Sequence, residues 1–178
     1  YLSLQCGVEI ARALGRSIHR WERAREMLGQ ALRSERNFDR TWPSKRRFAM
    51  DWFYPVLADV LSPETGLERL DERWDEFAAS KLGCRCVADQ NWHTAAETAE
   101  LVIALVRAGA RAKAGEMYRT LNQFRADDGG FWTGYVHPNA VPWPMERTTW
   151  TAGAVLLASD SVYGISPGAQ IFGAGQSG

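Results

Sequence analysis

Three features are scarce or missing in this sequence of 178 residues, and each excludes a class of protein. The 21 Lys and Arg residues balance 21 Asp and Glu residues, which excludes the strongly basic surface typical of nucleic-acid-binding proteins. No apolar run approaches the ~18 residues of a membrane-spanning helix, and we expect no signal peptide. The three cysteines, Cys6, Cys84 and Cys86, form a poor disulfide framework. We therefore predict a cytoplasmic protein in a reducing compartment.

Tryptophan, in contrast, is abundant, with eight residues in the chain. A buried or half-buried indole either anchors packing or stacks on a flat ligand such as a sugar ring. Apolar residues make up 46% and charged residues 24% of the chain, which is ordinary for a globular protein. The length is enough for one domain with a real core.

Two kinds of helix alternate along the chain. One kind has a single apolar face, as in the segment from Gly66 to Ser80, where Leu67, Leu70 and Trp74 recur at helical spacing among acidic residues. The other kind is apolar nearly all round, as in Leu101–Val106, and such helices are buried on every side. One-sided outer helices are predicted at about 19–33, 66–80 and 111–124, and buried inner helices at about 2–14, 52–61, 92–108 and 150–162.

This alternation predicts an all-α fold in which inner helices form a ring inside outer helices, because the helices of a simple bundle would all be one-sided. Three inner helices share a start signal of a capping residue before Trp, at Trp52, Trp92 and Trp150. Pro55 must then lie in the first turn of its helix or kink it. A short β-hairpin is expected in the Gly-, Pro- and Trp-rich loop before Trp150. Residues 1–163 form the helical domain, and residues 164–178 are expected to be a flexible tail, whose match to G-x-G-x-x-G is a false positive because no strand or helix flanks it.

The blocks QFRADDGGFWTGY and ERTTWTAGAVLLAS resemble the prenyltransferase/squalene-cyclase-like repeat proteins of bacteria. The stretches RFAMDWFYPVLADVL and GCRCVADQNWHTAAETAELVIAL are similar to the same group. The resemblance implies an (α/α)6 toroid, the architecture shared by terpene cyclases and six-hairpin glycosidases. The chain supplies about half of the six hairpins, and it opens at Tyr1 within a helix pattern. We therefore expect a fragment or processed chain that pairs with a missing N-terminal half or with itself, since an open edge exposes a large apolar patch.

The sequence departs from the cyclases at their acid motif, an Asp-x-Asp-Asp. The corresponding stretch here begins at Arg125 and lacks the first Asp. The fold therefore carries over from the resemblance, and the activity does not.

The end of the ring where the inner helices begin is the predicted functional rim, because helix N-termini attract anions. The candidate catalytic residues are Asp51, Asp89 and Glu146, one for each of three inner helices. Carboxylates across a cavity can serve as general acid and base on a glycosidic bond, or a protonated one can start a carbocation reaction. Helix capping is the alternative role for these acids.

The candidate substrate-binding residues cluster at the same rim by sequence. They are Trp52, Tyr54, Trp92, Trp132, Tyr135 and His137. Such aromatic residues either stack on sugar faces and stabilise cations, or wedge a helix start against its neighbour. Packing is favoured for Trp92 and Trp150, and a ligand-facing position for Trp132 or Tyr135 in the loop.

A zinc site is the sharper interpretation of Cys84 and Cys86 with Asp89 and His93, since all four residue types ligate zinc. Their spacing matches no structural zinc pattern, so buried free thiols are the preferred interpretation. No metal and no cofactor is predicted.

Three functions stay open at this point. The resemblance places an enzyme acting on an isoprenoid first. The alternative is a glycan-processing or glycan-binding protein of the six-hairpin glycosidase type, which the separated carboxylates and loop aromatics favour. The third is a non-catalytic helical scaffold.

Overall fold

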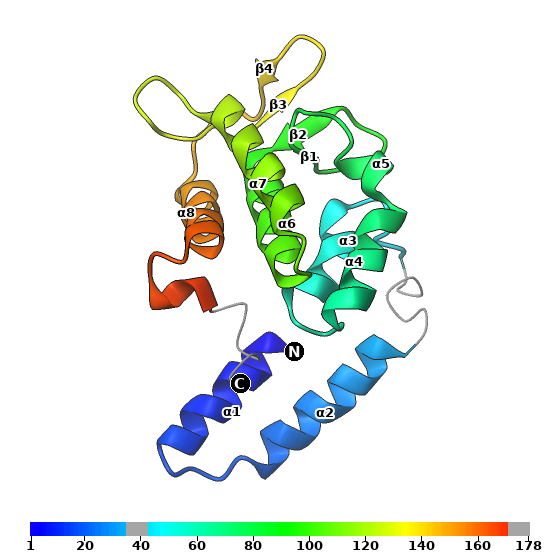
Figure 1. Cartoon of the computed structure of the whole chain (residues 1–178), viewed down its shortest axis with the longest axis vertical. Coiled ribbons are helices and arrows are strands. Elements are labelled where there is room, and N and C mark those ends of the chain that lie inside the picture. The colour runs from blue at the N-terminus through cyan, green and yellow to red at the C-terminus, as the bar shows by residue number, and fades with distance from the viewer. Residues whose placement is uncertain (35–42, 171–178) are drawn as a thin grey trace.

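The computed structural model describes residues 1–34 and 43–170 (Figure 1). This part of the chain is mostly helical, with a small antiparallel sheet. Its α-helices are α1 (Leu2–Ala13), α2 (His19–Arg33), α3 (Ala49–Leu57), α4 (Pro63–Glu72), α5 (Trp74–Phe77), α6 (Ala95–Arg107), α7 (Arg111–Thr120) and α8 (Thr149–Tyr163). The 3-10 helices are η2 (Leu121–Phe124) and η3 (Pro167–Gln170), and the strands are β1 (Cys84–Arg85), β2 (Trp92–Thr94), β3 (Gly134–Val136) and β4 (Val141–Pro142).

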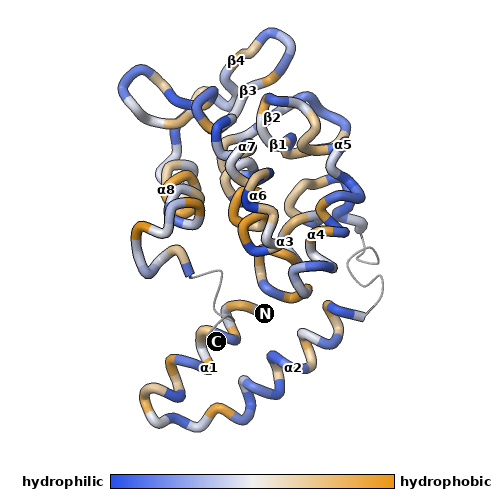
Figure 2. Tube along the Cα trace, in the orientation of Figure 1, coloured by the Kyte–Doolittle hydropathy of each residue, from blue (hydrophilic) through white to orange (hydrophobic). Residues whose placement is uncertain are grey.

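Helix α6 is the centre of the core. It packs against α3, α7 and α8, and nearly all of its residues from Ala95 to Leu105 are buried. The prediction of a buried inner helix is confirmed here. It is wrong for α8, where Trp150 and Leu156 expose 57% and 71% of their surface. Figure 2 shows that the middle of α8 is nevertheless hydrophobic, whereas α2 is mostly hydrophilic.

The predicted inner helix at 52–61 begins earlier and contains its proline. Helix α3 runs from Ala49 to Leu57, with Pro55 inside it rather than in the first turn. Proline has no N–H to donate to the carbonyl four residues earlier, that of Asp51. Arg69 Nη2 donates to this carbonyl at 3.0 Å, and Arg69 Nε donates to the carbonyl of Trp52 at 2.8 Å. The neighbouring helix α4 thus supplies the hydrogen bond that the proline withholds.

The shared start signal is corrected by the structure. The residues that cap α3, α6 and α8 are Phe48, Thr94 and Thr148, not the residue before each tryptophan. Trp92 lies in strand β2, three residues before α6 begins. Of these three caps, Thr148 has a side chain that accepts a hydrogen bond from the helix, from the N–H of Thr151.

The predicted outer helices are found, with one interruption. Helix α2 matches its predicted range of 19–33, and α7 with η2 covers 111–124. The segment at 66–80 instead forms α4 and the short α5, because Arg73 has the non-helical φ of −124°. The Arg73 side chain pairs with Glu76 and donates to the carbonyl of Arg46, which holds this break in place.

The sheet joins the starts of three helices. Within the described residues its order is β1-β2-β3-β4, all antiparallel, so the predicted hairpin is present as β3–β4. The first residue of α3, Ala49, donates to the carbonyl of Cys86, and that of α6, Ala95, donates to the carbonyl of Thr133. Thr133 N–H in turn donates to the carbonyl of Glu146, just before α8. The starts of α3, α6 and α8 therefore meet at one end, as the sequence predicted.

The α1–α2 hairpin lies apart from the rest of the molecule in Figure 1. Exposed apolar side chains on it include Ile10 and Met27, with 61% and 63% of their surface exposed. A closed ring of hairpins is not present among the residues that the structure describes, so the toroid stays a prediction. Of the predicted tail, residues 167–170 form η3 against α8, and residues 171–178 lie outside the described part. Among the described helices, none is long and apolar enough to cross a membrane.

Candidate active site

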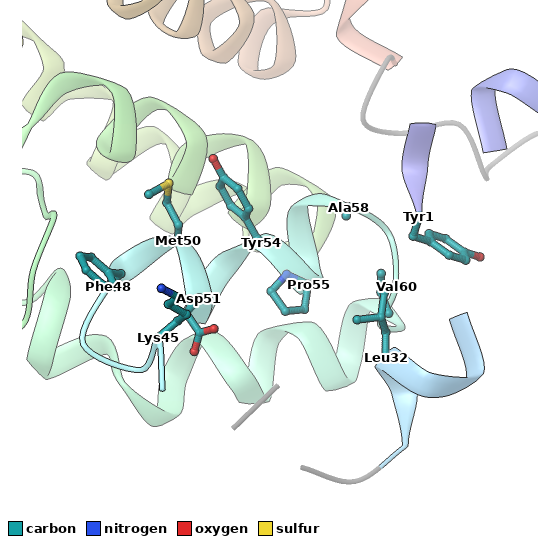
Figure 3. A pocket seen from close by; sticks show the side chains of 10 residues that line it. All are labelled: Tyr1, Leu32, Lys45, Phe48, Met50, Asp51, Tyr54, Pro55, Ala58 and Val60. Carbon is teal, nitrogen blue, oxygen red and sulfur yellow. The ribbon is translucent and has the colours of Figure 1, made fainter. Parts of the chain in front are cut away.

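Two adjoining cavities lie between α3 and its neighbours, one facing the α1–α2 hairpin and the other facing α1, α6 and α8. The first, of about 540 Å³, separates α3 from the α1–α2 hairpin and is lined by Tyr1, Leu32, Lys45, Phe48, Met50, Asp51, Tyr54, Pro55, Ala58 and Val60 (Figure 3). The second, of about 280 Å³, is lined by Leu2, Tyr54, Leu57, Ala58, Glu100, Ile103, Ala154 and Leu157. All four helices predicted as inner helices contribute to this second cavity.

Tyr54 belongs to both cavities. Figure 3 shows its ring and Met50 pointing from α3 to the same side, with Tyr1 and Leu32 at the far end of the cavity. The Tyr54 hydroxyl donates to Glu100 Oε1 at 3.4 Å. Burial and the Glu100 charge raise the pKa of Tyr54 to about 12, so this phenol stays a hydrogen-bond donor at neutral pH.

Glu100 is the carboxyl group of the second cavity. It lies on α6 among apolar residues, and burial raises its pKa to about 7, with a further contribution from the charge of Glu97. The hydrogen bond from Tyr54 acts in the opposite direction. A carboxyl group whose pKa is near 7 is partly protonated at neutral pH, which is the property of a general acid.

Glu97 lies one turn before Glu100 on the same helix and is 8% exposed. Its carboxylate accepts hydrogen bonds from the Thr94 hydroxyl and from the Cys86 thiol. These donors fix the carboxylate next to Glu100. The charge of Glu97 therefore favours the protonated form of Glu100.

Sequence reasoning missed both glutamates. Both lie within the inner helix predicted at about 92–108, but its apolar run is Leu101–Val106, and neither acid stands out as a candidate. A usable signal was present: two acidic residues three apart fall on one face of a helix otherwise made of buried residues. Buried carboxyls of this kind are candidates for functional groups.

Asp51 lines the first cavity, in the first turn of α3. It is one of the three predicted catalytic acids, and it shares this cavity with Tyr54. The structure therefore brings Asp51 to one side of Tyr54 and Glu100 to the other. The proposed role of Asp51 as a catalytic carboxylate stays a prediction.

The other two predicted acids lie elsewhere at the same end of the molecule. Asp89 forms an exposed ion pair with Arg47, at 3.0 Å from Nη2 to Oδ1, in the segment that leads to β2. Glu146 is exposed in the loop before α8, and its carbonyl accepts hydrogen bonds from Thr133. Neither lines the two cavities of Asp51 and Glu100.

Trp52 is not placed to bind a substrate. It has no exposed surface, and its ring stacks on Phe77 at 5.3 Å with an interplanar angle of 18°. Its Nε1 donates to the carbonyl of Arg69 at 2.8 Å. The predicted ligand contact is therefore corrected to a core position, where the indole closes the α3–α4 packing.

The remaining aromatic candidates lie around the sheet. Trp92 donates from Nε1 to the carbonyl of Trp143 and packs edge-on against that ring, so its described contacts are packing contacts. Trp132 is half-buried, with the Arg147 guanidinium over its ring at 5.2 Å. Arg147 is paired in turn with Asp128.

Tyr135 and His137 line a small cavity of about 260 Å³ beside the sheet. His137 packs edge-on against His93, whose ring is buried and whose Nε2 is 2.9 Å from the Ser80 hydroxyl. Burial, reinforced by the charges of His137 and Arg85, lowers the pKa of His93 to about 4. His93 is therefore a neutral core residue at physiological pH.

Cys84 and Cys86 are buried free thiols, as the sequence favoured. Burial and the Glu97 charge raise the pKa of both thiols, so neither is a nucleophile at neutral pH. Within residues 1–34 and 43–170, no group of three or more His, Cys, Asp and Glu side chains is placed to hold a metal ion.

Comparison with known proteins favours the glycan interpretation. Over 172 residues the chain is 39% identical to the MMP endo-(1,4)-3-O-methyl-alpha-D-mannosidase of Mycolicibacterium hassiacum, a match that covers 97% of the chain. The chain is homologous to a glycoside hydrolase. It spans 47% of the mannosidase, about half the length of the curated relative that it matches. No protein-family model matches the chain.

The homology corrects the order in which the functions were ranked. An enzyme of the prenyltransferase or cyclase type, which the resemblance placed first, is not supported. The glycosidase alternative is favoured, because the sequence match to the mannosidase extends over nearly the whole length of the chain.

Proposed function

We propose that this protein is a glycoside hydrolase that cleaves within an α-(1,4)-linked mannose-type glycan. The 39% identity to an endo-acting mannosidase over nearly the whole chain carries the proposal. The cavity that contains Glu100 supports it, because glycoside hydrolysis needs a carboxylic acid that is still protonated at working pH.

Glu100 is the proposed general acid. Its protonated oxygen donates to the glycosidic oxygen as the bond to the anomeric carbon breaks, so the leaving sugar departs as an alcohol. Tyr54 donates to Oε1, which leaves Oε2 as the oxygen that carries the proton. Glu97 stays fixed by Thr94 and Cys86 and keeps the pKa of Glu100 high until the proton is transferred.

The partner carboxylate is assigned to Asp51, on the other side of Tyr54. In a retaining enzyme it would attack the anomeric carbon, and in an inverting enzyme it would activate a water molecule. The mannosidase is about twice the length of this chain, so a carboxylate from the region that the chain does not cover is the alternative source. Loss of turnover in Asp51→Asn, with glycan binding retained, favours Asp51.

The test is hydrolysis of a 3-O-methylmannose oligosaccharide by the native protein, followed by the release of reducing ends. Glu100→Gln keeps the shape of the side chain and removes the proton donor, so kcat should fall by about 100-fold or more while KM changes little. The matched control is Glu116→Gln, which changes an exposed glutamate on α7. A wild-type protein that binds the glycan without ever cleaving it would sink the proposal and favour the scaffold.

A further inference from the structure

A larger cavity, of about 710 Å³, lies at the other end of the helices, where α6 and α8 end and where α4 and α7 begin. Opposed helix dipoles meet at this end and largely offset one another, so the side chains decide its charge. Its charged lining residues are Asp59, Arg107 and Arg111. Two guanidinium groups and one carboxylate leave a net charge of +1.

Arg107 is the unusual group of this cavity. Its side chain is 9% exposed, and Nη2 pairs with Asp59 Oδ1. Nε and Nη1 are buried and have no hydrogen-bond partner among the described residues. A buried charged donor without a partner is costly, so native proteins rarely leave one without a ligand or water at the site.

We propose that this cavity binds a carboxylate, held by Arg107 and Arg111. The net charge of +1 matches a monoanion, whereas a dianion such as phosphate would leave an unbalanced charge. The remaining lining residues include apolar side chains, among them Leu61, Ile103, Val106 and Val162. They suit the apolar or sugar stem that carries the carboxylate.

Asp59 pairs with Nη2 of the Arg107 guanidinium, and its negative charge opposes a second carboxylate at the same group. It has a positive φ of 57° just after α3, a conformation that Asp and Asn tolerate better than most residues. Asp59→Asn therefore removes the competing charge and preserves the backbone, so carboxylates should bind more tightly in this variant, by at least about twofold. A variant that merely damages the fold would bind carboxylates more weakly, so an increase in affinity distinguishes the two cases.

The experiment is calorimetric titration of the native protein with hexanoate, with D-glucuronate and with inorganic phosphate. Arg107→Gln should weaken carboxylate binding by about tenfold or more, and the exposed Arg111→Gln by about two- to fivefold. Arg119→Gln, an exposed change on the same helix as Arg111 and outside this cavity, should change nothing. Hexanoate binding alone indicates a free aliphatic acid, and glucuronate binding indicates an acid carried by a sugar.

Several results would overturn the proposal. They are the absence of binding by both carboxylates, tighter binding of phosphate, unchanged affinity in the two arginine variants, or weaker binding in Asp59→Asn. None of these variants lies in the cavities of Glu100, so hydrolysis of the glycan and carboxylate binding here can succeed or fail separately.

Discussion

Glu100 makes the sharpest prediction, because its protonation can be measured without knowing the substrate. Its pKa is raised in the folded protein from 4.5 to about 7. In the unfolded chain the pKa of Glu100 returns to 4.5. Between pH 4.5 and 7, Glu100 is therefore ionised in the unfolded state while it is still protonated in the folded state. The sign follows directly: ionisation of Glu100 makes the folded protein less stable as the pH rises through this window.

The magnitude comes from the size of the shift. A difference of about 2.5 pKa units at 1.36 kcal/mol per unit is a penalty of about 3 kcal/mol above pH 7. Glu100→Gln keeps the volume of the side chain and cannot ionise. The variant should therefore be more stable than the wild type by up to about 3 kcal/mol at pH 8, relative to their difference at pH 4.

Urea unfolding of both proteins at intervals from pH 4 to pH 9 measures this difference. Subtracting the two curves removes the contribution of other titrating groups, apart from Glu97, which couples to Glu100. A difference that stays within about 0.5 kcal/mol across the whole range would refute the reasoning, since Glu100 would then be an ordinary surface carboxyl.

Further predictions concern the neighbours of Glu100 and the core. Glu97→Gln removes a charge that raises the pKa of Glu100, so the alkaline limb of the pH–activity profile should move to lower pH. Tyr54→Phe removes a hydrogen bond that lowers this pKa, so the limb should move to higher pH, and a common direction in both variants would contradict the assignment. Trp52→Ala should destabilise the protein by about 3–5 kcal/mol in urea unfolding, because the indole has no exposed surface. Trp150→Ala, at a position with 57% exposure, is the control and should cost much less.

Periodicity was sufficient to predict where the helices lie, because burial of one face leaves a 3.6-residue pattern in the sequence. The ranges of α2 and α7 with η2 were predicted closely for this reason. The common end of α3, α6 and α8 was also predicted, as was the β3–β4 hairpin, but strands β1 and β2 were not. Strands β1 and β2 are two and three residues long, too short for an alternating pattern to emerge.

The candidate site was predicted less well, for a different reason. The place of Trp52 in the sequence predicts a rim residue, but its burial is decided by α4 and α5, which pack on it from elsewhere in the chain. Glu100 is not predicted from the sequence, because acidic residues are usually exposed. Its pKa depends on the apolar surroundings supplied by α3 and α8, which no local pattern contains.

The hydrogen bonds between Arg69 and the α3 backbone have a consequence for the evolution of the chain. Arg69 donates to the carbonyl that Pro55 leaves without a helical donor, and Trp52 donates back to the Arg69 carbonyl. A homologue in which Pro55 is replaced regains the backbone N–H donor, so it no longer requires the guanidinium of Arg69. A homologue that keeps the proline should also keep the arginine. Positions 55 and 69 should therefore vary together among homologues, and lysine should be a poor substitute because it presents a single point charge where the guanidinium reaches two carbonyls.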